Sequence, residues 1–341
     1  MKIRLGLIGL GDAWETRHRS ALLSLIDRFE VRAVCAEVAC RAEQVAREFS
    51  ADAIDGFRSL MARPDVDAVL LLSSSWYGAL PILASCDAGK AIYCASSLEI
   101  DLEKAQEVKR RVEQSGIAFM FELPRRYAPA TLRLKELMAT CLGPPRLVFC
   151  HWRLPVAFPA GAARNGRRPI DVARGLLELV DWCRYVVGSD PTSVFGVCHR
   201  SQGEEAHSDY QMMSLDFSPP DSPGTGPVAQ ISCGSYMPTN WPEAITFRPP
   251  AALQVACQRG VAFIDLPASL VWFDAAGRHL ESLDDERPVG EQLLTHFYRA
   301  VTSLVRKTEN LEDVYQALRI VFGATRSFQN GRRVPLDEPP G

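Results

Sequence analysis

Apolar and polar positions alternate along the first 122 residues in short buried runs and amphipathic stretches. The apolar runs predict strands at residues 2–8, 30–36, 67–72, 91–94 and 117–121. The amphipathic stretches predict helices at about 14–27, 41–49, 56–62, 77–87 and 101–115. Strands that alternate with helices of this length are typical of βαβ units. We therefore predict that residues 1–122 form a dinucleotide-binding Rossmann domain, an α/β fold with a doubly wound parallel sheet.

The pattern changes after Glu122. A helix at about 128–140 precedes predicted strands at 145–153, 193–200, 210–217, 228–236, 252–258 and 261–265, and one long helix at 170–187 lies among them. Loops rich in Pro and Gly, such as SPPDSPGTGP at 218–227, favour antiparallel connections. We expect residues 123–290 to form an α+β substrate and oligomerisation domain with a large, mostly antiparallel open sheet. Residues 291–341 are predicted to be helices that pack back on both domains, with a frayed tail after Val334.

Composition narrows the class of protein. Of the 341 residues, 47% are hydrophobic and 23% are charged, which is ordinary for a globular chain and argues against disorder. A formal net charge of −3 provides no basic field for nucleic acid or an anionic membrane. The opening MKIRLGLIGLG is interrupted by glycines and has no cleavage site, so we do not interpret it as a signal peptide. We predict a cytoplasmic protein with neither a nucleic acid nor a membrane as partner.

The ten cysteines are scattered and contain no C-x-x-C pair. Several lie in predicted core elements (Cys35, Cys94, Cys233), where cysteine behaves as a small hydrophobic residue. Metal ligation requires clustered Cys or His at short spacing, and the sequence has none. We predict reduced thiols and no metal site.

A glycine turn follows the first predicted strand and precedes the first helix, where a dinucleotide fingerprint belongs. The first glycine, Gly9, allows a tight turn, and Gly11 lets the backbone approach a pyrophosphate held by helix N–H groups. The third position of the fingerprint normally holds Gly or Ala, but here it is Trp14. Two interpretations remain open: a cofactor turn made by Gly9, Gly11, Asp12, Ala13 and Trp14, or an empty turn in which Trp14 fills the space near the pyrophosphate.

The second strand should end in an acid that accepts the adenosine ribose hydroxyls. It ends instead in Cys35-Ala36-Glu37, so Glu37 comes one residue late. Arg41 lies nearby and could meet a 2′-phosphate. Ser73 and Ser74, directly after the strand at 67–72, complete the predicted cofactor-binding set. The cofactor is therefore predicted to be NAD or NADP, with the choice between them open.

At this point the sequence resembles the glucose–fructose oxidoreductase and inositol dehydrogenase family, Gfo/Idh/MocA. The likeness extends over almost the whole chain, and its segments are the glycine turn followed by Arg17-His18, VDAVLLL, Ala88-Gly89-Lys90, Arg126-Tyr127-Ala128-Pro129, Leu142-Gly143-Pro144, Arg259-Gly260 and Ala324-Thr325-Arg326-Ser327. The resemblance implies a nicotinamide-dependent oxidoreductase acting on a sugar, cyclitol or other polyol. It also implies a homodimer or homotetramer formed through the open sheet.

The sequence departs from this family where the chemistry is performed. The family's Glu-Lys-Pro triplet corresponds here to Ala95, Ser96 and Ser97. Its Pro-Asn and downstream His correspond to Ser74, Ser75 and Gly78, and its helical Asp and His correspond to Arg174 and Glu178. Dehydrogenation needs a positioned base for the hydroxyl proton. We therefore expect a degenerate active site with altered or lost chemistry, polyol dehydrogenation that is weak or absent, and weak cofactor binding.

Substitute catalytic groups are Glu178, Ser96 and Arg174. Ser96 is too weak a base to act alone, whereas Glu178 could act as a base if burial raised its pKa. Asp171, Arg174, Glu178 and Asp181 share one face of the helix at 170–187, which fits either a polar strip lining the nicotinamide cleft or a salt-bridged helix face. Candidate substrate residues are Arg126, His151, Arg153, Asp171 and Tyr236. We assign His18 to helix packing rather than to catalysis.

Two functions remain from the sequence. The first is an NAD(P)-binding oxidoreductase of this type that takes a sugar-like small molecule. The alternative is a non-catalytic ligand-binding or scaffold protein that retains the family fold. The glycine turn favours the first, while Trp14, Ala36 and Ser96 favour the second.

Overall fold

The computed structural model describes residues 2–11, 13–73, 77–95, 101–156, 172–200, 208–238, 243, 250–284, 286–304 and 308–336. The chain divides into two compact units. The first contains Met1–Tyr127 and Arg287–Tyr315, and the second contains Ala128–Glu286 and Gln316–Gly341. The finer division at residues 122 and 290 stays a prediction.

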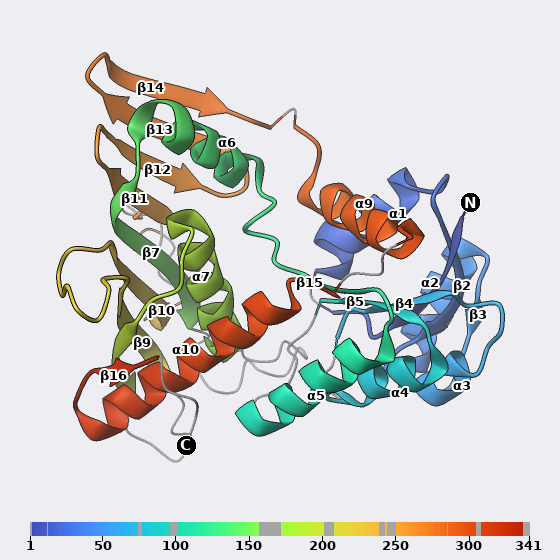
Figure 1. Cartoon of the computed structure of the whole chain (residues 1–341). Helices are drawn as coiled ribbons and strands as arrows, with labels where there is room; N and C mark the ends of the chain where they lie inside the picture. Colours follow the sequence, from blue (N-terminus) through green and yellow to red (C-terminus); the bar gives the residue numbers. More distant parts are fainter. Residues whose placement is uncertain are drawn as a thin grey trace. The chain divides into compact units, whose positions relative to one another are not determined.

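The first unit is built on a parallel sheet of seven strands (Figure 1). Its strands are β1 Ile3–Ile8, β2 Phe29–Cys35, β3 Asp52–Ala53, β4 Ala68–Leu71, β5 Ala91–Cys94, β6 Phe119–Phe121 and β15 Thr308–Glu309. They lie in the order β15-β6-β5-β4-β1-β2-β3, and every pairing is parallel. The predicted doubly wound sheet is confirmed. The short strand β15 was not predicted, because two residues carry no readable pattern.

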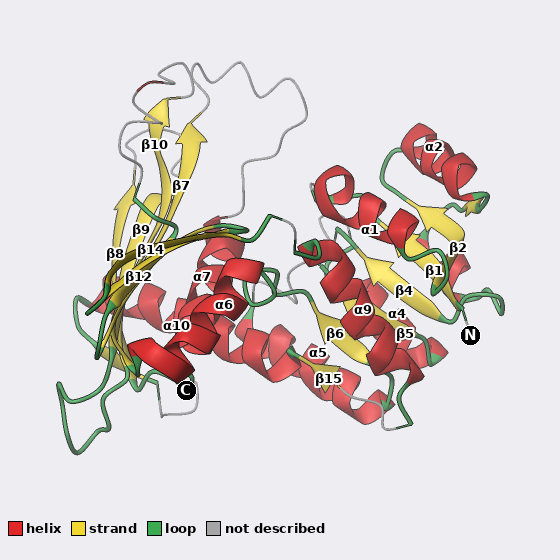
Figure 2. Cartoon of the chain, turned by 90° about the horizontal axis from the view of Figure 1, so that it is seen from above, coloured by secondary structure: helices red, strands yellow, loops and turns green. Residues whose placement is uncertain are grey.

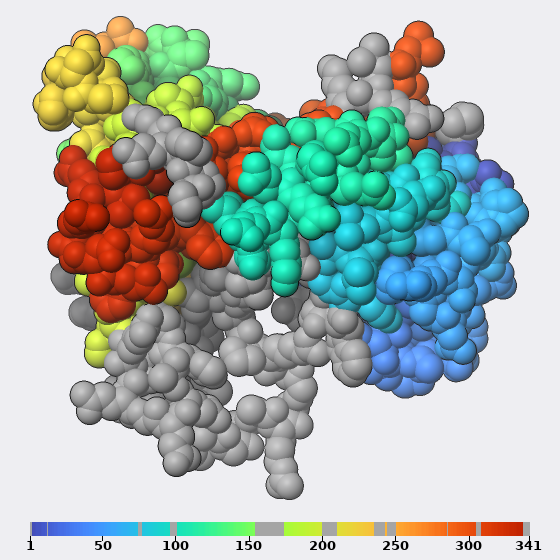
Figure 3. Space-filling view, turned by 60° about the horizontal axis from the view of Figure 1, so that its bottom comes forward, coloured from blue at the N-terminus to red at the C-terminus, as the bar shows by residue number. Residues whose placement is uncertain are grey.

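Helices cover both faces of this sheet (Figure 2). Their bounds are η1 Trp14–His18, α1 Arg19–Ser24, α2 Ala39–Phe49, α3 Phe57–Met61, α4 Leu80–Ala88, α5 Leu102–Ser115 and α9 Val289–Thr302. Apolar residues of α1, α2 and α9 join those of the sheet in one core cluster. Helices α3, α4 and α5 pack side by side and form a continuous outer layer of the unit (Figure 3).

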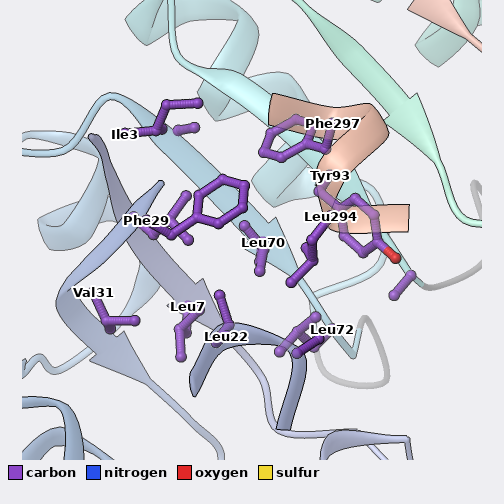
Figure 4. Packing of buried hydrophobic residues seen from close by; sticks show 14 of the residues in the cluster. Ile3, Leu7, Leu22, Phe29, Val31, Leu70, Leu72, Tyr93, Leu294 and Phe297 are labelled. Atoms are coloured by element: carbon purple, nitrogen blue, oxygen red, sulfur yellow. The ribbon is translucent and has the colours of Figure 1, made fainter. Parts of the chain in front are cut away.

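The core of the first unit combines residues that lie far apart in the sequence. Figure 4 shows Leu294 and Phe297 of α9 beside Leu70 of β4 and Tyr93 of β5. The rings of Tyr93 and Phe297 meet edge to face, with centroids 5.6 Å apart. Strand β5 precedes α9 by almost 200 residues in the chain. Burial of the apolar surface between them stabilises the packing of α9 on the sheet by roughly 25 cal/mol per Å² of buried area.

The helix predicted at 14–27 is interrupted in the structure. Residues 14–18 form a wide turn in which the Ala13 carbonyl accepts from the N–H groups of both Arg17 (2.9 Å) and His18 (3.2 Å). A regular α-helix, α1, follows and ends at Ser24. Such an i→i+5 turn is rare and often lies at a functional site.

The second unit contains a nine-stranded sheet in the order β14-β13-β12-β11-β7-β10-β9-β8-β16. Its strands are β7 Pro145–Val156, β8 Ser193–Arg200, β9 Ser208–Asp216, β10 Val228–Pro238, β11 Leu253–Cys257, β12 Val261–Asp265, β13 Ser269–Asp274, β14 Gly277–Ser282 and β16 Val334–Pro335. Among the described strands of this sheet, β7 and β10 are the one parallel pair, so the predicted mostly antiparallel sheet is confirmed.

The hairpin β13–β14 was not predicted, because SLVWFD and GRHLES alternate only weakly. Val334 and Pro335 pair with β8, so the chain remains attached to the sheet just beyond the point where fraying was expected. Residues 337–341 lie outside the described part of the chain.

Helices of the second unit lie on one face of its sheet (Figure 2). They are α6 Pro129–Leu137, η2 Met138–Leu142, α7 Val172–Val187 and the residues of α10 (Leu311–Asn330) from 316 onward. The Trp152 ring of β7 packs on Gly175 of α7, and Gly196 of β8 lies against the Ala324 carbonyl of α10.

The opposite face of this sheet carries exposed apolar side chains on six strands. These residues are Leu147, Phe195, Val197, Met212, Val228, Phe273 and Leu280, and the strand registers place them on the same side. We call this surface the open face. Apolar side chains exposed on one face of a sheet are candidates for an interaction site in soluble proteins.

Among the helices that the structure describes, none is both long enough and apolar enough to cross a membrane.

Candidate cofactor-binding site

The glycine turn lies at the carboxyl edge of the parallel sheet, directly after β1. The neighbours of β1 are β4 on one side and β2 on the other, so the strand order reverses at this position. Ligands of doubly wound proteins bind in the crevice at such a switch point, because the two flanking connections leave in opposite directions.

The geometry of the turn explains both glycines. Gly9 has φ +70°, a conformation that disfavours other residues. A Cβ on Gly11 would come within 2.3 Å of the Leu72 carbonyl oxygen, at the end of β4. Both glycines are therefore required by the protein's own packing, and they hold the turn close to the neighbouring strand.

The backbone donors of the turn suit an anion. Within the described part of the chain, the N–H groups of Leu10, Gly11 and Ala13 donate no hydrogen bond, and Gly11 and Ala13 are partly exposed. Uncommitted N–H groups before a helix are the usual ligands of a pyrophosphate. The turn thus fits the diphosphate of a dinucleotide.

The structure corrects the interpretation of Trp14. Its side chain is fully buried and belongs to the core cluster, with its ring centroid 6.1 Å from that of Phe49 in α2. Because the indole points into the core, it does not fill the exposed side of the turn where a pyrophosphate would lie. The wide turn of η1 accompanies this large residue at the third fingerprint position.

The adenosine end of the site lies beyond β2. Ala36 is partly buried there, and Glu37 and Arg41 are exposed. The Cys35 thiol lies 4.0 Å from the Tyr77 hydroxyl, and burial raises the pKa of both groups. Tyr77 also packs edge to face on Phe57, with centroids 5.0 Å apart. Ser73 follows β4 and is partly exposed beside Gly9.

A polar cluster of four residues, three of them buried, adjoins the glycine turn, and it was not predicted from the sequence. Glu122, the residue after β6, accepts from His18 Nε2 and from the Tyr93 hydroxyl, each at 2.7 Å on Oε2. Arg17 Nη2 forms an ion pair with Glu122 Oε1. We call these four residues the Glu122 cluster. A carboxylate only accepts, so His18 Nε2 carries the hydrogen of its bond.

The Glu122 carboxyl group is fully buried but ionised. Burial raises its pKa, but the charges of His18 and Arg17 and the hydrogen bonds from His18 and Tyr93 lower the pKa to about 2. Burial also raises the pKa of Tyr93 well above its ordinary value, so its hydroxyl keeps the proton. The sequence contains an indication of this buried carboxylate, because in FMFELP an acid stands between apolar residues at the end of a buried strand.

Comparison with known proteins agrees with this geometry. Residues 3–123 match the family model GFO_IDH_MocA, described as an oxidoreductase family with an NAD-binding Rossmann fold. Inositol 2-dehydrogenase 3 of Saccharopolyspora erythraea is 30% identical over 189 residues, which are 52% of this chain and 54% of that protein. Residues 3–123 therefore match the NAD-binding Rossmann domain of the Gfo/Idh/MocA family.

Solved structures share the whole fold. The aldose–aldose oxidoreductase of Caulobacter crescentus, complexed with glycerol, superposes with a TM-score of 0.80 at 15% identity over 98% of this chain and all of that one. A levoglucosan dehydrogenase in complex with NADH and levoglucosan gives a TM-score of 0.78 at 16% identity, over 99% of this chain and all of that one. The chain spans about half the length of the curated relatives it matches.

The structure brings together Arg174 and Glu178, the two residues that the sequence analysis aligned with the family's helical Asp and His. On α7, Arg174 Nε lies 3.6 Å from Glu178 Oε1. Asp181, one turn further, is buried and lies 3.7 Å from Arg184. Arg174 and Glu178 therefore form an ion pair along the helix, as one of the two sequence interpretations requires.

Of the other candidate residues, two lie on the open face of the second unit and one lies in the first unit. His151 and Arg153 alternate with Trp152 as predicted, and they lie on the open face, where His151 Nδ1 is 2.7 Å from Ser232 Oγ. Burial and the charge of Arg153 lower the pKa of His151. Arg126 Nη1 donates to Asp313 at 3.0 Å within the first unit. Asp12, Ser74, Ser96, Asp171 and the side chain of Tyr236 lie outside the described residues.

Proposed function

We propose that this chain is an NAD(P)-binding oxidoreductase that acts on a sugar, a cyclitol or another polyol-like small molecule. The observation that carries the proposal is the glycine turn at the switch point, within a segment that matches the NAD-binding family model. The substrate class follows relatives named inositol 2-dehydrogenase and neighbours that bind glycerol or levoglucosan.

The chain's own residues define how a cofactor would be held. The N–H groups of Leu10, Gly11 and Ala13 would bind the diphosphate, and Ser73 would border it. A nicotinamide dinucleotide supplies hydride transfer when bound. The ribose end has Ala36 in place of the usual acid, which supports weak binding. Arg41 favours a 2′-phosphate and Glu37 opposes it, so both NAD and NADP are candidates.

We further propose that polyol dehydrogenation is altered or lost. In the sequence, Arg174 and Glu178 align with the family's Asp and His, and the proposal is supported by the ion pair that they form with each other. Catalysis by a positioned base is typically worth about 10²–10⁴ in rate, so replacing it removes most of the activity. Glu178 is the one replacement whose chemistry could partly compensate. The same pair favours the alternative function, a ligand-binding or scaffold protein without turnover.

The open face supports a homodimer or homotetramer. Exposed apolar residues on six strands would lie against water in a single chain, which costs free energy in proportion to their area. A second copy of the same sheet would cover them.

A titration with NADH and NADPH, followed by calorimetry and by nicotinamide fluorescence, tests the proposed function. We expect saturable, weak binding of at least one cofactor. Gly11→Val should abolish it, because the added side chain clashes with the Leu72 carbonyl and displaces the turn. Absence of heat and of fluorescence change at millimolar concentrations of both cofactors would contradict the proposal.

A further inference from the structure

The Glu122 cluster connects the glycine-turn helix to a distant part of the sheet. The sheet order is β6-β5-β4-β1, so Glu122, after β6, lies three strands away from β1, which leads into the turn. Arg17 and His18 reach across the ends of β4 and β5 to both oxygens of its carboxylate. Tyr93 holds one of these oxygens from β5.

The wide turn of η1 makes this double contact possible. Consecutive residues of a regular α-helix point about 100° apart, so two neighbours rarely meet one carboxylate. Here Arg17 and His18 both share the Ala13 carbonyl as acceptor, and both reach Glu122. The carboxylate therefore fixes the rotation of the helix at the residues that directly follow the glycine turn.

The location of the Glu122 cluster distinguishes it from a group that only packs in the core. The side chain of Glu122 is 0% exposed, whereas that of Arg17 is 23% exposed beside the carboxyl edge of the sheet. In Figure 4 the Tyr93 hydroxyl lies at the rim of the apolar cluster, where its ring is packed against Phe297 of α9. The polar bonds lie at the edge where the turn presents its N–H groups.

We propose that Glu122 is a positioning residue for cofactor binding, which acts through Arg17 and His18 to hold the helix after the glycine turn in its binding orientation. This inference rests on the proposed function, because it presumes a cofactor at the turn. Glu122 itself touches no cofactor. Its carboxylate preorganises the backbone donors of Gly11 and Ala13, so that binding does not have to order them.

Glu122→Gln tests the proposal because it keeps the shape of the side chain and removes its charge. If the variant populates the binding orientation a tenth of the time, the apparent Kd for NADH rises about tenfold. Lys90→Met is the matched control. Lys90 is also buried in the first unit and donates to the carbonyls of Arg63 and Val66, but it precedes β5 at the opposite edge of the sheet. We expect Lys90→Met to lower Tm while leaving the Kd of the folded protein within about twofold.

Hydrogen exchange of the peptide covering residues 14–24 separates the positioning function from the proposed function. We expect exchange there to accelerate in Glu122→Gln and to stay unchanged in Lys90→Met, whether or not cofactor is present. If the wild type binds no NADH or NADPH but the exchange difference appears, the proposed function fails and the positioning of the helix stands. Unchanged exchange in Glu122→Gln would overturn the positioning function itself.

A variant without the Arg17–Glu122 ion pair keeps the test decisive if Glu122→Gln does not fold. Replacing both members of a buried ion pair with apolar residues is often neutral for stability. We therefore expect Arg17→Met/Glu122→Met to fold, to bind NADH about tenfold more weakly and to exchange faster at residues 14–24. A folded double variant with wild-type Kd and wild-type exchange would overturn the inference.

Discussion

The buried Glu122 carboxylate predicts a definite loss of stability when its charge is removed. Its pKa is lowered from an ordinary 4.5 to about 2 in the folded protein. At about 1.4 kcal/mol per pKa unit, this lowering corresponds to roughly 3 kcal/mol of folding free energy at neutral pH. Removing one partner of a buried ion pair costs a similar ~3–5 kcal/mol. Glu122→Gln should therefore lower the free energy of unfolding by about 3 kcal/mol at pH 7.

The sign of the pH dependence follows from the direction of the pKa shift. Because the folded pKa is the lower one, the unfolded chain takes up the proton first as the pH falls. The stabilisation is complete above about pH 5 and is lost as the pH falls from about 4.5 toward 2. Between pH 7 and about pH 3.5, roughly 1 kcal/mol of this stabilisation should disappear from the wild type but not from Glu122→Gln.

Urea unfolding at both pH values, followed by tryptophan fluorescence, measures these free energies. Glu113→Gln is the control: Glu113 is half-exposed on α5 and pairs with Lys109 at 2.9 Å, so its loss should cost less than about 1 kcal/mol. Two results would refute the reasoning. One is a cost below about 1 kcal/mol for Glu122→Gln at pH 7, and the other is a gap between wild type and variant that stays constant down to pH 3.5.

Three further predictions follow from the same structure. Trp14→Ala should lower the free energy of unfolding by about 3–5 kcal/mol in chemical denaturation, because it empties a core site; a loss below 1 kcal/mol would place Trp14 outside the core. In light scattering the wild type should have the mass of a dimer or larger assembly, above the 37.7 kDa of one chain. Leu147→Lys (44% exposed, on the open face) should reduce that mass, whereas the control Leu23→Lys (43% exposed, on α1) should not. A monomeric wild type would contradict this prediction. A screen of sugars and cyclitols with both cofactors should give no robust turnover, and any slow activity should fall at least about 100-fold in Glu178→Gln; fast polyol oxidation would contradict the proposed loss.

The fold was largely predictable from the sequence because the parallel strands β4, β5 and β6 and the end of β1 are uninterrupted apolar runs. Runs such as LGLI before Gly9 and AVLLL before Ser73 are buried on both faces of the sheet, so their pattern is unambiguous. The hairpin β13–β14 has one face exposed and carries His279 and Glu281 among its apolar residues, which weakens the pattern. Strands β15 and β16 depend only on tertiary pairing.

The candidate site could be predicted only where its residues are neighbours in the sequence. The glycine turn is a contiguous motif, and its position was predicted correctly. The sequence left the placement of Trp14 open, because it does not show that the helix widens at residues 14–18 and lets the indole enter the core. The Glu122 cluster joins residues 17, 18, 93 and 122, and only the strand order brings these positions together.

A crystal structure of the protein grown with millimolar NADH tests the central claim most directly. We predict density for a dinucleotide at the carboxyl edge of the parallel sheet, with its diphosphate within about 3 Å of the N–H groups of Gly11 and Ala13. Trp14 should remain buried against Phe49, and Glu122 should keep its bonds to Arg17 and His18. A well-ordered glycine turn without a nucleotide beside it, in crystals that tolerate the ligand, would contradict the claim that this turn is a cofactor site.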